Sequence, residues 1–331
     1  MTGAAGFIGS HLCAQLLAAG DTVIGIDALT EFYDPLRKRR NLAEALRCPA
    51  FSFHPVDVLD PPLDALLDGV EVVYHLAGQP GVRPSWGREF ALYTSRNVLA
   101  TQRLLEAVRD HPLRKFVHAS SSSVYGDAHS FPTPETACPR PVSPYGVTKL
   151  AAEQLCELYR TTYGLPTASL RLFSVYGPRQ RPDMAFARLF AAASGGPRFP
   201  LYGDGGQTRD FTYVRDVVAA MRDAACSRFT GIANLGGGRP VSMRQAIAAV
   251  ERIAGPVALD RRPAPPGDAR HTGADITVAA REFAFRPRTR LEDGLAAMAE
   301  HAAREDAERP NGALNTGIRT PGTGIGGGRR E

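Results

Sequence analysis

The chain has 331 residues, enough for two domains or for one large domain with an addition. Apolar residues make up 44% of it and charged residues 22%, which is near the average for globular proteins and excludes collagen, a coiled coil and global disorder. A net charge of +5 is weak for a protein that binds the nucleic-acid backbone, and it suits a small anionic ligand at least as well. We expect a globular protein that binds no nucleic acid.

The five cysteines stand far apart and form no CxxC pair. This argues against a disulfide framework or a zinc site and favours the reducing cytoplasm. No apolar run reaches the roughly 18 residues that suggest a membrane helix, and no charged-then-apolar leader opens the chain. The sequence therefore predicts a cytoplasmic protein with no membrane contact and no metal.

Short runs rich in β-branched residues alternate with segments of helical spacing. The predicted strands are 22–27, 51–58, 70–77, 114–121 and 166–175, and the helices among them are 11–19, 90–110 and 144–163. Near-continuous apolar strands that alternate with helices are typical of a parallel sheet covered on both faces. We expect an α/β protein with a doubly wound, Rossmann-type sheet.

A GxxGxxG motif, Gly3–Gly9, precedes the first predicted helix, and Asp27 ends the strand after it. The glycines let backbone amides approach a pyrophosphate, while the acid accepts hydrogen bonds from ribose hydroxyls and repels a 2′-phosphate. The pattern predicts NAD rather than NADP as the cofactor. The nearby basic run Arg37–Arg40 is open to the opposite interpretation, but we interpret it as a solvated helix face.

This glycine motif should follow a buried first strand, yet only Met1 and Thr2 precede it. Either the strand is missing or very short, or the true start codon lies upstream. We favour the upstream start and expect a truncated first strand here.

Tyr145 and Lys149 form a YxxxK motif, whose two side chains share one face of a helix. Ser143 and Pro144 fit its N-cap and first helical position, which places Tyr145 near the positive end of the helix dipole. A tyrosine has an ordinary pKa of about 10 and needs a much lower pKa to act as a base. We expect Lys149, the dipole and a cationic nicotinamide to supply it; the alternative is a surface aromatic beside a solvated lysine.

Four serines, Ser120–Ser123, close the predicted strand 114–121. A hydroxyl at this strand end faces the cofactor and can share the substrate's proton with Tyr145. The alternative is a serine-rich turn, and the residues alone do not choose among the four serines.

After Gly177 the pattern loosens, with helices predicted at 183–193, 214–226 and 242–253. We expect an NAD-binding domain at 1–175, to which 210–235 returns. A smaller, interleaved α/β substrate-binding lobe then comprises 176–209 and 236–305. The last segment, 306–331, has too little apolar surface to offset its ordering entropy, and we expect it to be disordered.

Taken together, these motifs carry a family resemblance. The chain resembles the extended short-chain dehydrogenase/reductase family, in its branch of nucleotide-sugar epimerases and dehydratases, over about residues 1–300. The shared marks are Thr2–Gly9, Asp57–Val58, His75–Gly78, Asn97–Val98, the serine strand, the YxxxK motif and Tyr176–Pro178.

The resemblance implies a role for individual residues. Ser121, four residues before Tyr125, matches the catalytic Ser or Thr, so the implied catalytic set is Ser121, Tyr145 and Lys149. A homodimer formed through the helices 90–110 and 144–163 is also implied. The implied cofactor site comprises Gly3, Gly6, Phe7, Ile8, Gly9, Asp27, Asp57, Val58, Leu76, Ala77, Gly78, Asn97, Tyr145, Lys149 and Phe173.

The branches of this family differ just after the catalytic hydroxyl. Dehydratases and decarboxylases carry acids there, where this chain has Ser122 and Ser123. Without a carboxyl group there is no obvious acid or base for elimination. What remains is oxidation of the sugar followed by return of the hydride, which is epimerisation at carbon 4.

The segment from Ser174 to Ala185 resembles the UDP-glucuronate 4-epimerases, and Phe32–Asp34, Arg40–Leu42 and Gly81–Arg83 do so too. Arg181 is our candidate for binding a hexuronate carboxylate or a phosphate, because guanidinium pairs bidentately with either. Its alternative role is to cap the helix that starts near residue 183. Arg83 is a second candidate, with a loop salt bridge as its alternative.

Residues 200–214 resemble the family's uridine diphosphate segment. This implies that the backbone at Pro200 and Tyr202 holds the base and that Arg209 holds the diphosphate; Ser122 and Ser174 complete the implied substrate site. The stretch Pro266–Asp268 matches the family only in part, and Arg270 is a candidate to supply the missing phosphate contact.

The implied reaction is therefore the conversion of UDP-glucuronate to UDP-galacturonate with NAD as cofactor. UDP-glucose, or the substrate of another epimerase or dehydratase of the family, is the alternative within enzymes. A catalytically silent NAD-binding protein is the alternative outside them. The intact set of Ser121, Tyr145 and Lys149 favours catalysis.

Overall fold

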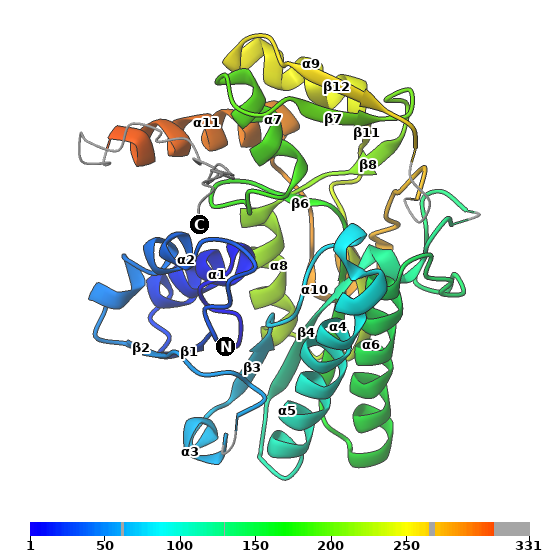
Figure 1. Cartoon of the computed structure of the whole chain (residues 1–331). Helices are drawn as coiled ribbons and strands as arrows, with labels where there is room; N and C mark the ends of the chain where they lie inside the picture. The colour runs from blue at the N-terminus through cyan, green and yellow to red at the C-terminus, as the bar shows by residue number, and fades with distance from the viewer. Residues whose placement is uncertain (61–62, 129, 265–268, 308–331) are drawn as a thin grey trace, which may run out of the picture.

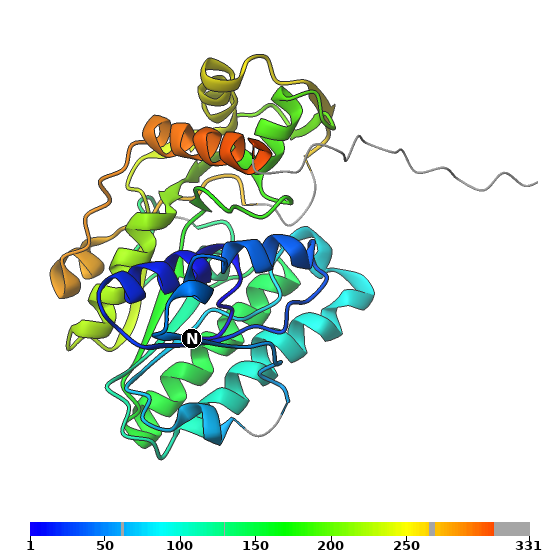
Figure 2. The ribbon, with the colours of Figure 1, turned by 90° about the vertical axis from the view of Figure 1, so that its left-hand side faces the viewer.

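The structure is a computed structural model that describes residues 1–60, 63–128, 130–264 and 269–307. A parallel sheet with helices on both faces forms the lower part of the molecule in Figure 1, and a smaller lobe lies above it. Figure 2 shows the same two parts from the side. Of the segment 306–331, which we expect to be disordered, residues 306 and 307 belong to the helix that ends at Ala307, so the expectation is wrong for these two. The rest of that segment and the partial match at 266–268 lie outside the described residues.

The main sheet is parallel throughout and confirms the Rossmann-type fold. Its strand order is β2-β1, then Thr2, then β3-β4-β5-β10. The strand bounds are β1 (Val23–Ile26), β2 (Phe51–His54), β3 (Val72–His75), β4 (Lys115–Ser121), β5 (Thr167–Leu172) and β10 (Gly231–Leu235).

The place of the expected first strand is held by Met1 and Thr2. Thr2 bridges both Ile26 of β1 and His75 of β3. Its N–H donates to the carbonyl of Tyr74 at 3.0 Å, and the N–H of Ile26 donates to the carbonyl of Met1 at 2.8 Å. The structure therefore has the very short strand, which is enough to join β1 to β3 and to lead into the glycine motif.

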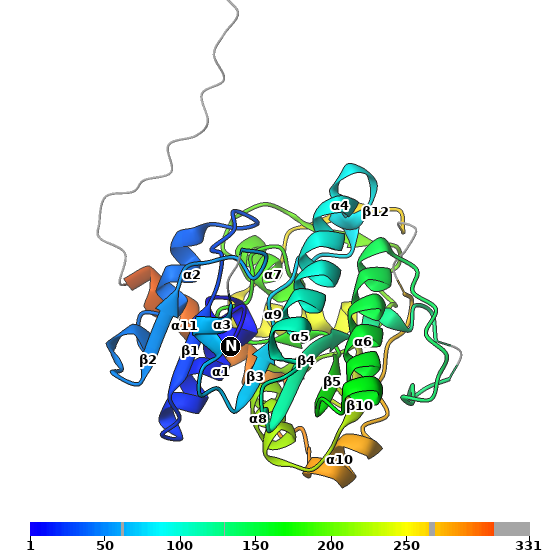
Figure 3. The same ribbon diagram turned by 90° about the horizontal axis from the view of Figure 1, so that it is seen from below.

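Successive residues of the central strands point to opposite faces of the sheet, as pleating requires. Tyr74 and Val117 belong to the buried cluster that contains residues of α1 (Phe7–Ala18) and α8 (Val214–Cys226). Their neighbours Val73 and Phe116 belong to a second cluster, with residues of α5 (Ala100–Val108) and α6 (Pro144–Tyr163). Figure 3 shows the two helix layers on either side of the sheet.

Helix α6 begins and ends at the predicted residues because both ends are marked chemically. The Ser143 hydroxyl accepts the N–H of Gly146 at 3.1 Å, and Pro144 is the first helical residue. Gly164 ends the helix in the left-handed conformation, with φ of 70°.

The predicted helix 90–110 is instead three consecutive helical segments. They are α4 (Phe90–Tyr93), a π-helical turn (Thr94–Leu99) and α5. The π turn carries Asn97, which is buried: its Oδ1 accepts the N–H of Gln79 at 2.7 Å, and its Nδ2 donates to the hydroxyl of Thr148 at 2.9 Å. Asn97 thus ties the loop after β3 to helix α6.

The smaller lobe is built from short strand pairs. The pairs are β6 (Val175–Tyr176) with β9 (Thr212–Tyr213), β7 (Phe199–Tyr202) with β12 (Leu259–Arg262), and β8 (Thr208–Asp210) with β11 (Pro240–Ser242).

The remaining α-helices of the described residues, in both parts of the molecule, are α2 (Pro35–Asn41), α3 (Asp64–Leu67), α7 (Ala185–Ala193), α9 (Met243–Ala254), α10 (Thr277–Phe283) and α11 (Leu291–Ala307). The domain boundaries stay a prediction.

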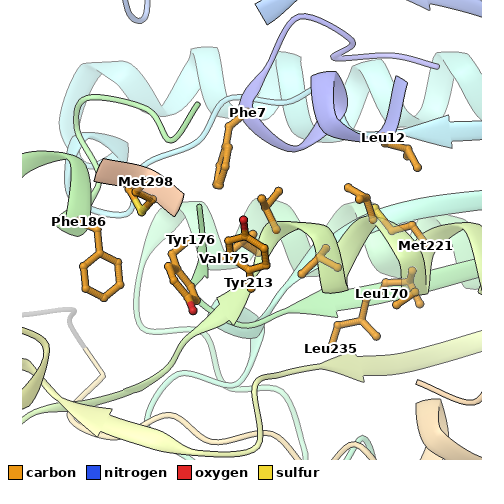
Figure 4. Packing of buried hydrophobic residues seen from close by; sticks show 14 of the residues in the cluster. Phe7, Leu12, Leu170, Val175, Tyr176, Phe186, Tyr213, Met221, Leu235 and Met298 are labelled. Carbon is orange, nitrogen blue, oxygen red and sulfur yellow. The ribbon is translucent and has the colours of Figure 1, made fainter. Parts of the chain in front are cut away.

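One buried cluster joins the lobe to the sheet. Figure 4 shows Phe7 of α1 in the same cluster as Tyr176, Phe186 and Tyr213 of the lobe. The lobe is therefore anchored to the helix that follows the glycine motif. Among the described residues, no helix combines the length and the apolar character that crossing a membrane requires.

Candidate active site

A cavity of about 570 Å³ lies where the carboxyl ends of the main-sheet strands face the smaller lobe. Ligands of open α/β sheets bind in this place because the loops after parallel strands converge there. The structure brings nearly all of the predicted site residues together around the cavity: Gly3, Gly6, Phe7, Ile8, Gly9, Asp27, Asp57, Val58, Leu76, Ala77, Gly78, Arg83, Asn97, Ser121, Ser122, Tyr145, Lys149, Ser174, Arg181, Pro200, Tyr202 and Arg209.

Phe173 is the exception, because it is not among the residues that line the cavity. Its neighbours Leu172 and Ser174 line the cavity, so the alternation of an extended chain points Phe173 the other way. Its ring packs in a buried cluster, 6.2 Å from the ring of Tyr125 between centroids. Phe173 supports the site from behind.

The glycine motif has no room for side chains at Gly3 and Gly9, which leaves the space beside its backbone open to a ligand's phosphates. A Cβ on Gly9 would lie 2.1 Å from the carbonyl oxygen of Gly3, and a Cβ on Gly3 would lie 2.7 Å from the nitrogen of Ala77. Gly6 is the N-cap of α1, and no side chain caps this helix end. The first amides of α1 therefore remain to bind an anion, and the residues fit the pyrophosphate of NAD.

Asp27 lies at the carboxyl end of β1, beside the glycine motif. Its Oδ2 accepts the N–H of Ala5 at 3.1 Å, and its Oδ1 accepts the N–H of Leu29 at 2.8 Å. The carboxylate is therefore held at the carboxyl end of β1, where it lines the cavity.

The basic run on α2 is only partly solvated. Arg39 and Arg40 are exposed, but Lys38 is buried, lines the cavity and donates from Nζ to the hydroxyl of Thr30 at 3.1 Å. Burial lowers the pKa of Lys38, and the charge of Asp27 opposes this. The solvated-face interpretation is therefore wrong for Lys38. Asn41 lies one turn later on the same face of α2, and its Nδ2 donates to the carbonyl of Ala5. A polar, uncharged residue at this spacing was the signal in the sequence that this face turns inward.

Tyr145 sits in the first turn of α6 and is held on two sides. Its N–H donates to the hydroxyl of Ser85 at 3.1 Å, and its ring meets the ring of Tyr93 edge-on at 6.2 Å between centroids. Ser121 lies across from it at the end of β4, where its Oγ accepts the N–H of Ser123 at 3.1 Å.

The titration of Tyr145 differs from the expectation. Burial raises the pKa of Tyr145, while a hydrogen bond with Ser121 and the charge of Arg181 oppose the rise. Burial outweighs these two neighbours, so the pKa of Tyr145 lies above its ordinary value.

Lys149 lies one turn further along α6. Its Nζ donates to the carbonyl of Ala119 at 2.6 Å, so the ammonium is anchored to β4. Burial lowers the pKa of Lys149 to about 8, and interactions with Cys156 and Glu153 oppose this.

Arg181 is paired within its own loop. Its Nε and Nη2 donate to the two carboxylate oxygens of Asp183, each at 3.0 Å. Helix α7 begins only at Ala185 and has Met184 as N-cap without a side-chain bond, so the alternative of a helix cap is wrong. The guanidinium lines the cavity in a bidentate pair of the kind that a substrate carboxylate forms.

Arg83 and Tyr202 meet across the cavity. The Cζ of Arg83, in the loop after β3, lies 4.0 Å from the ring centroid of Tyr202 on β7, a contact within cation–π range. Arg209 lines the cavity nearby and donates to the carbonyl of Thr208 at 2.9 Å. Arg270 is exposed, lies 3.9 Å from Asp204 and is not among the residues that line the cavity.

The cavity wall is positively charged, which suits a dinucleotide and a nucleotide sugar with their phosphates. Lys38, Arg96 and Arg188 belong to this wall and were missed in the sequence, although Arg96 is next to Asn97. The cationic lining residues are Lys38, Arg83, Arg96, Lys149, Arg181, Arg188 and Arg209, and the acidic ones are Asp27, Asp57 and Asp183. Across the described ranges, no group of three His, Cys, Asp or Glu side chains could hold a metal ion.

Comparison with known proteins agrees with this geometry. Residues 1–234 match the model of the NAD dependent epimerase/dehydratase family. The chain is 43% identical over 302 residues to the uncharacterized UDP-glucose epimerase YtcB of Bacillus subtilis, covering 89% of this chain and 94% of that one. It is 35% identical over 303 residues to the UDP-glucuronate 4-epimerase of Thermodesulfobacterium geofontis, covering 89% and 93%.

A solved structure is similar over the same region. The UDP-glucuronic acid 4-epimerase from Bacillus cereus, in complex with UDP-glucuronic acid and NAD, superposes with a TM-score of 0.88 at 41% sequence identity. The match covers 92% of this chain and 98% of that one.

Proposed function

The chain belongs to the NAD-dependent epimerase/dehydratase family, and from this premise we propose that it converts UDP-glucuronate to UDP-galacturonate by inverting carbon 4. The enzyme is an NAD-dependent nucleotide-sugar 4-epimerase. The observation that carries the choice of sugar is Arg181, which lines the same cavity as Ser121 and Ser122 and whose guanidinium already binds a carboxylate, that of Asp183.

NAD fits the part of the cavity that is lined by residues of the main sheet and its loops. The amides at the start of α1 suit its pyrophosphate, Asp27 suits the adenosine ribose, and Asp57 with Val58 suits the adenine. When bound, NAD supplies a reversible hydride acceptor, so the cofactor is not consumed. The nicotinamide end then falls at Tyr145 and Lys149, which line the same cavity.

Tyr145 is the base of the proposed mechanism. As a phenolate it removes the proton of the sugar 4-hydroxyl while hydride leaves carbon 4. Ser121 orients that hydroxyl, and the ammonium of Lys149 stabilises the phenolate. The 4-keto sugar turns over, receives the hydride on its other face, and takes the proton back from Tyr145.

A uronate creates a specific difficulty, because its 4-keto form is a β-keto acid that loses carbon dioxide. The carboxylate must be held with its breaking bond poorly aligned with the carbonyl. We assign this task to Arg181, which exchanges Asp183 for the substrate, with Ser122 and Ser174 beside it. The two residues after Ser121 are serines and not acids, so elimination of water lacks a catalyst.

Product analysis by NMR tests the function. The protein is incubated separately with UDP-glucuronate, UDP-glucose and dTDP-glucose, each with added NAD. We expect UDP-galacturonate from the first, with slow or no conversion of the other two. Fast interconversion of UDP-glucose and UDP-galactose alone would favour the UDP-glucose 4-epimerase, and no conversion of any sugar would favour the silent NAD-binding protein.

The protein is further proposed to act in the cytoplasm as a homodimer that pairs α5 and α6 with their copies. Its cysteines, all free, suit a reducing compartment. Leu99, Val147 and Leu158 lie on these neighbouring helical segments with 44%, 47% and 53% of their surface exposed. Val147 and Leu158 are eleven residues apart, three turns, and share one face of α6.

Light scattering after size exclusion tests the dimer. Leu158→Glu should yield a monomer, because a charge would be buried at the centre of the contact. Leu46→Glu is the matched control, since Leu46 is 54% exposed and lies outside these helices. A wild-type monomer, or a dimer in both variants, rejects this interface.

A further inference from the structure

A buried ion pair lies behind the proposed catalytic residues. Glu153 is two turns along α6 from Tyr145, and Arg171 is on β5; they are 0% and 2% exposed. The Nε of Arg171 donates to Oε2 of Glu153 at 2.9 Å, and its Nη2 donates to Oε1 at 2.6 Å. This bidentate pair links the helix to the sheet without any contact with solvent.

Strand β4 is bound to the same pair. The hydroxyl of Ser120 donates to Oε2 of Glu153 at 2.6 Å, and the carbonyl of the preceding Ala119 accepts from Lys149 at 2.6 Å. Ser121, the next residue, faces Tyr145. Three successive residues of β4 are thus set against Glu153, Lys149 and Tyr145, which share one face of α6 at a spacing of four residues.

The far side of Arg171 is also filled. Its Cζ lies 4.6 Å from the ring centroid of Tyr125, and its Nη1 donates to the carbonyl of Glu135 at 3.3 Å. The hydroxyl of Tyr125 donates in turn to Oδ1 of Asn234 at 2.7 Å. The guanidinium therefore has one geometry available, and the carboxylate it holds is fixed in place.

We infer that Glu153 and Arg171 are positioning residues for the proposed epimerisation: their ion pair, with Ser120, fixes Ser121 against Tyr145 and Lys149 and adds no net charge beside them. The inference rests on the proposed function. Apolar residues at these two positions would pack α6 on the sheet at a lower cost in free energy, because burying two charges is costly and often not stabilising. Here the pair provides what apolar packing lacks, a directional register between the helix and two strands.

Net neutrality matters because other ionisable groups face the reacting pair from every element packed around it. They are His75 on β3, His118 on β4, Tyr93 on α4, Cys156 on α6 and Arg181 in the loop before α7, while Tyr125, after β4, faces Arg171. The two histidines are fully buried, and burial keeps their pKa far below the usual range, so they remain neutral. An unpaired charge at Glu153 or Arg171 would act directly on Lys149 and Tyr145.

Two variants separate positioning and charge from simple structural support. Glu153→Gln leaves the Arg171 cation uncompensated, because guanidinium keeps its proton. A nearby cation favours the deprotonated forms of Tyr145 and Lys149 alike, so both limbs of the pH profile of kcat should move to lower pH, by about one pH unit. In Glu153→Gln with Arg171→Met the site is neutral again, and both limbs should return to the wild-type pH while kcat stays reduced.

A third variant keeps the charge and moves it. Glu153→Asp withdraws the carboxylate by one methylene, and we expect kcat to fall about tenfold with unmoved pH limbs, because displacements of about 1 Å in a site cost up to ~100-fold. If Glu153→Gln does not fold, this variant carries the test. Hydrogen exchange of the cofactor-free variants should be faster in 115–125 and 144–155 than in wild type.

The outcomes are distinct. Equal kcat in Glu153→Asp and wild type, or identical pH limbs in Glu153→Gln and in the double variant, overturns the inference. Absence of epimerisation by the wild-type protein overturns the proposed function instead, because the comparison among variants then has no reaction to report on.

Discussion

Replacing Gly9 by Ala should cost the protein its NAD. The new Cβ would lie 2.1 Å from the Gly3 carbonyl oxygen, and it needs at least 3.0 Å. Either the glycine loop or the start of α1 must therefore move by about 1 Å, a strain that costs about 1–3 kcal/mol in a packed site. The free protein can relax by letting the loop move, but the bound dinucleotide needs it in place, so this cost falls on binding. We expect NAD to bind about 5- to 150-fold more weakly.

The direction of the change in NAD affinity is informative. Alanine favours a helix by about 1 kcal/mol over glycine, so helix propensity alone would make Gly9→Ala more stable, and weaker NAD binding would report the steric clash. The assay is the NAD content of the purified protein and the Kd by calorimetry. Gly164→Ala is the control: it also adds a methyl to a glycine, at φ of 70° with nothing within 4 Å. It should lower the free energy of unfolding by the cost of left-handed backbone, about 1–2 kcal/mol, and Tm with it, while NAD is retained. Wild-type affinity in Gly9→Ala would refute the reasoning.

Three further predictions concern the chemistry. Tyr145→Phe should lower kcat by about 10²–10⁴-fold with NAD retained, and a loss below tenfold would exclude Tyr145 as the base. Arg181→Ala should raise KM for UDP-glucuronate or release a pentose by-product, with retention of NAD as the control; unchanged kinetics and product would reject its role. Because burial lowers the pKa of Lys149 to about 8, its ammonium form is complete well below that pH and is lost above it. The rate should therefore fall as pH rises through about 8, and a rate that stays flat to pH 10 would contradict this.

Local chemical signals explain which elements could be predicted. Helix α6 is bounded by Ser143, Pro144 and Gly164, and its ends were predicted to the residue. Helix 90–110 carries no such internal mark, and its π turn follows from tertiary contacts of Asn97 with Gln79 and Thr148, which no local pattern shows.

The same distinction applies to the candidate site. Motif residues converge on the cavity because parallel strands end on one edge of the sheet. That the ring of Phe173 turns away from the cavity could not be predicted, because a motif position says nothing about which face of the chain the side chain takes. Lys38 was misread because Arg39 and Arg40, which follow it, are exposed, and within the run Arg37–Arg40 it alone is buried. The pair of Glu153 and Arg171 is invisible in sequence, since two charged residues on separate elements indicate contact only once the fold is known.

The central claim is that one enzyme-bound cycle removes hydride from carbon 4 and returns it to the same carbon. UDP-glucuronate that carries deuterium at carbon 4, incubated with the wild-type protein and NAD in ordinary water, tests this most directly. We predict UDP-galacturonate that keeps its deuterium at carbon 4, as read by NMR. Deuterium lost to solvent, or found at another carbon, would contradict the account.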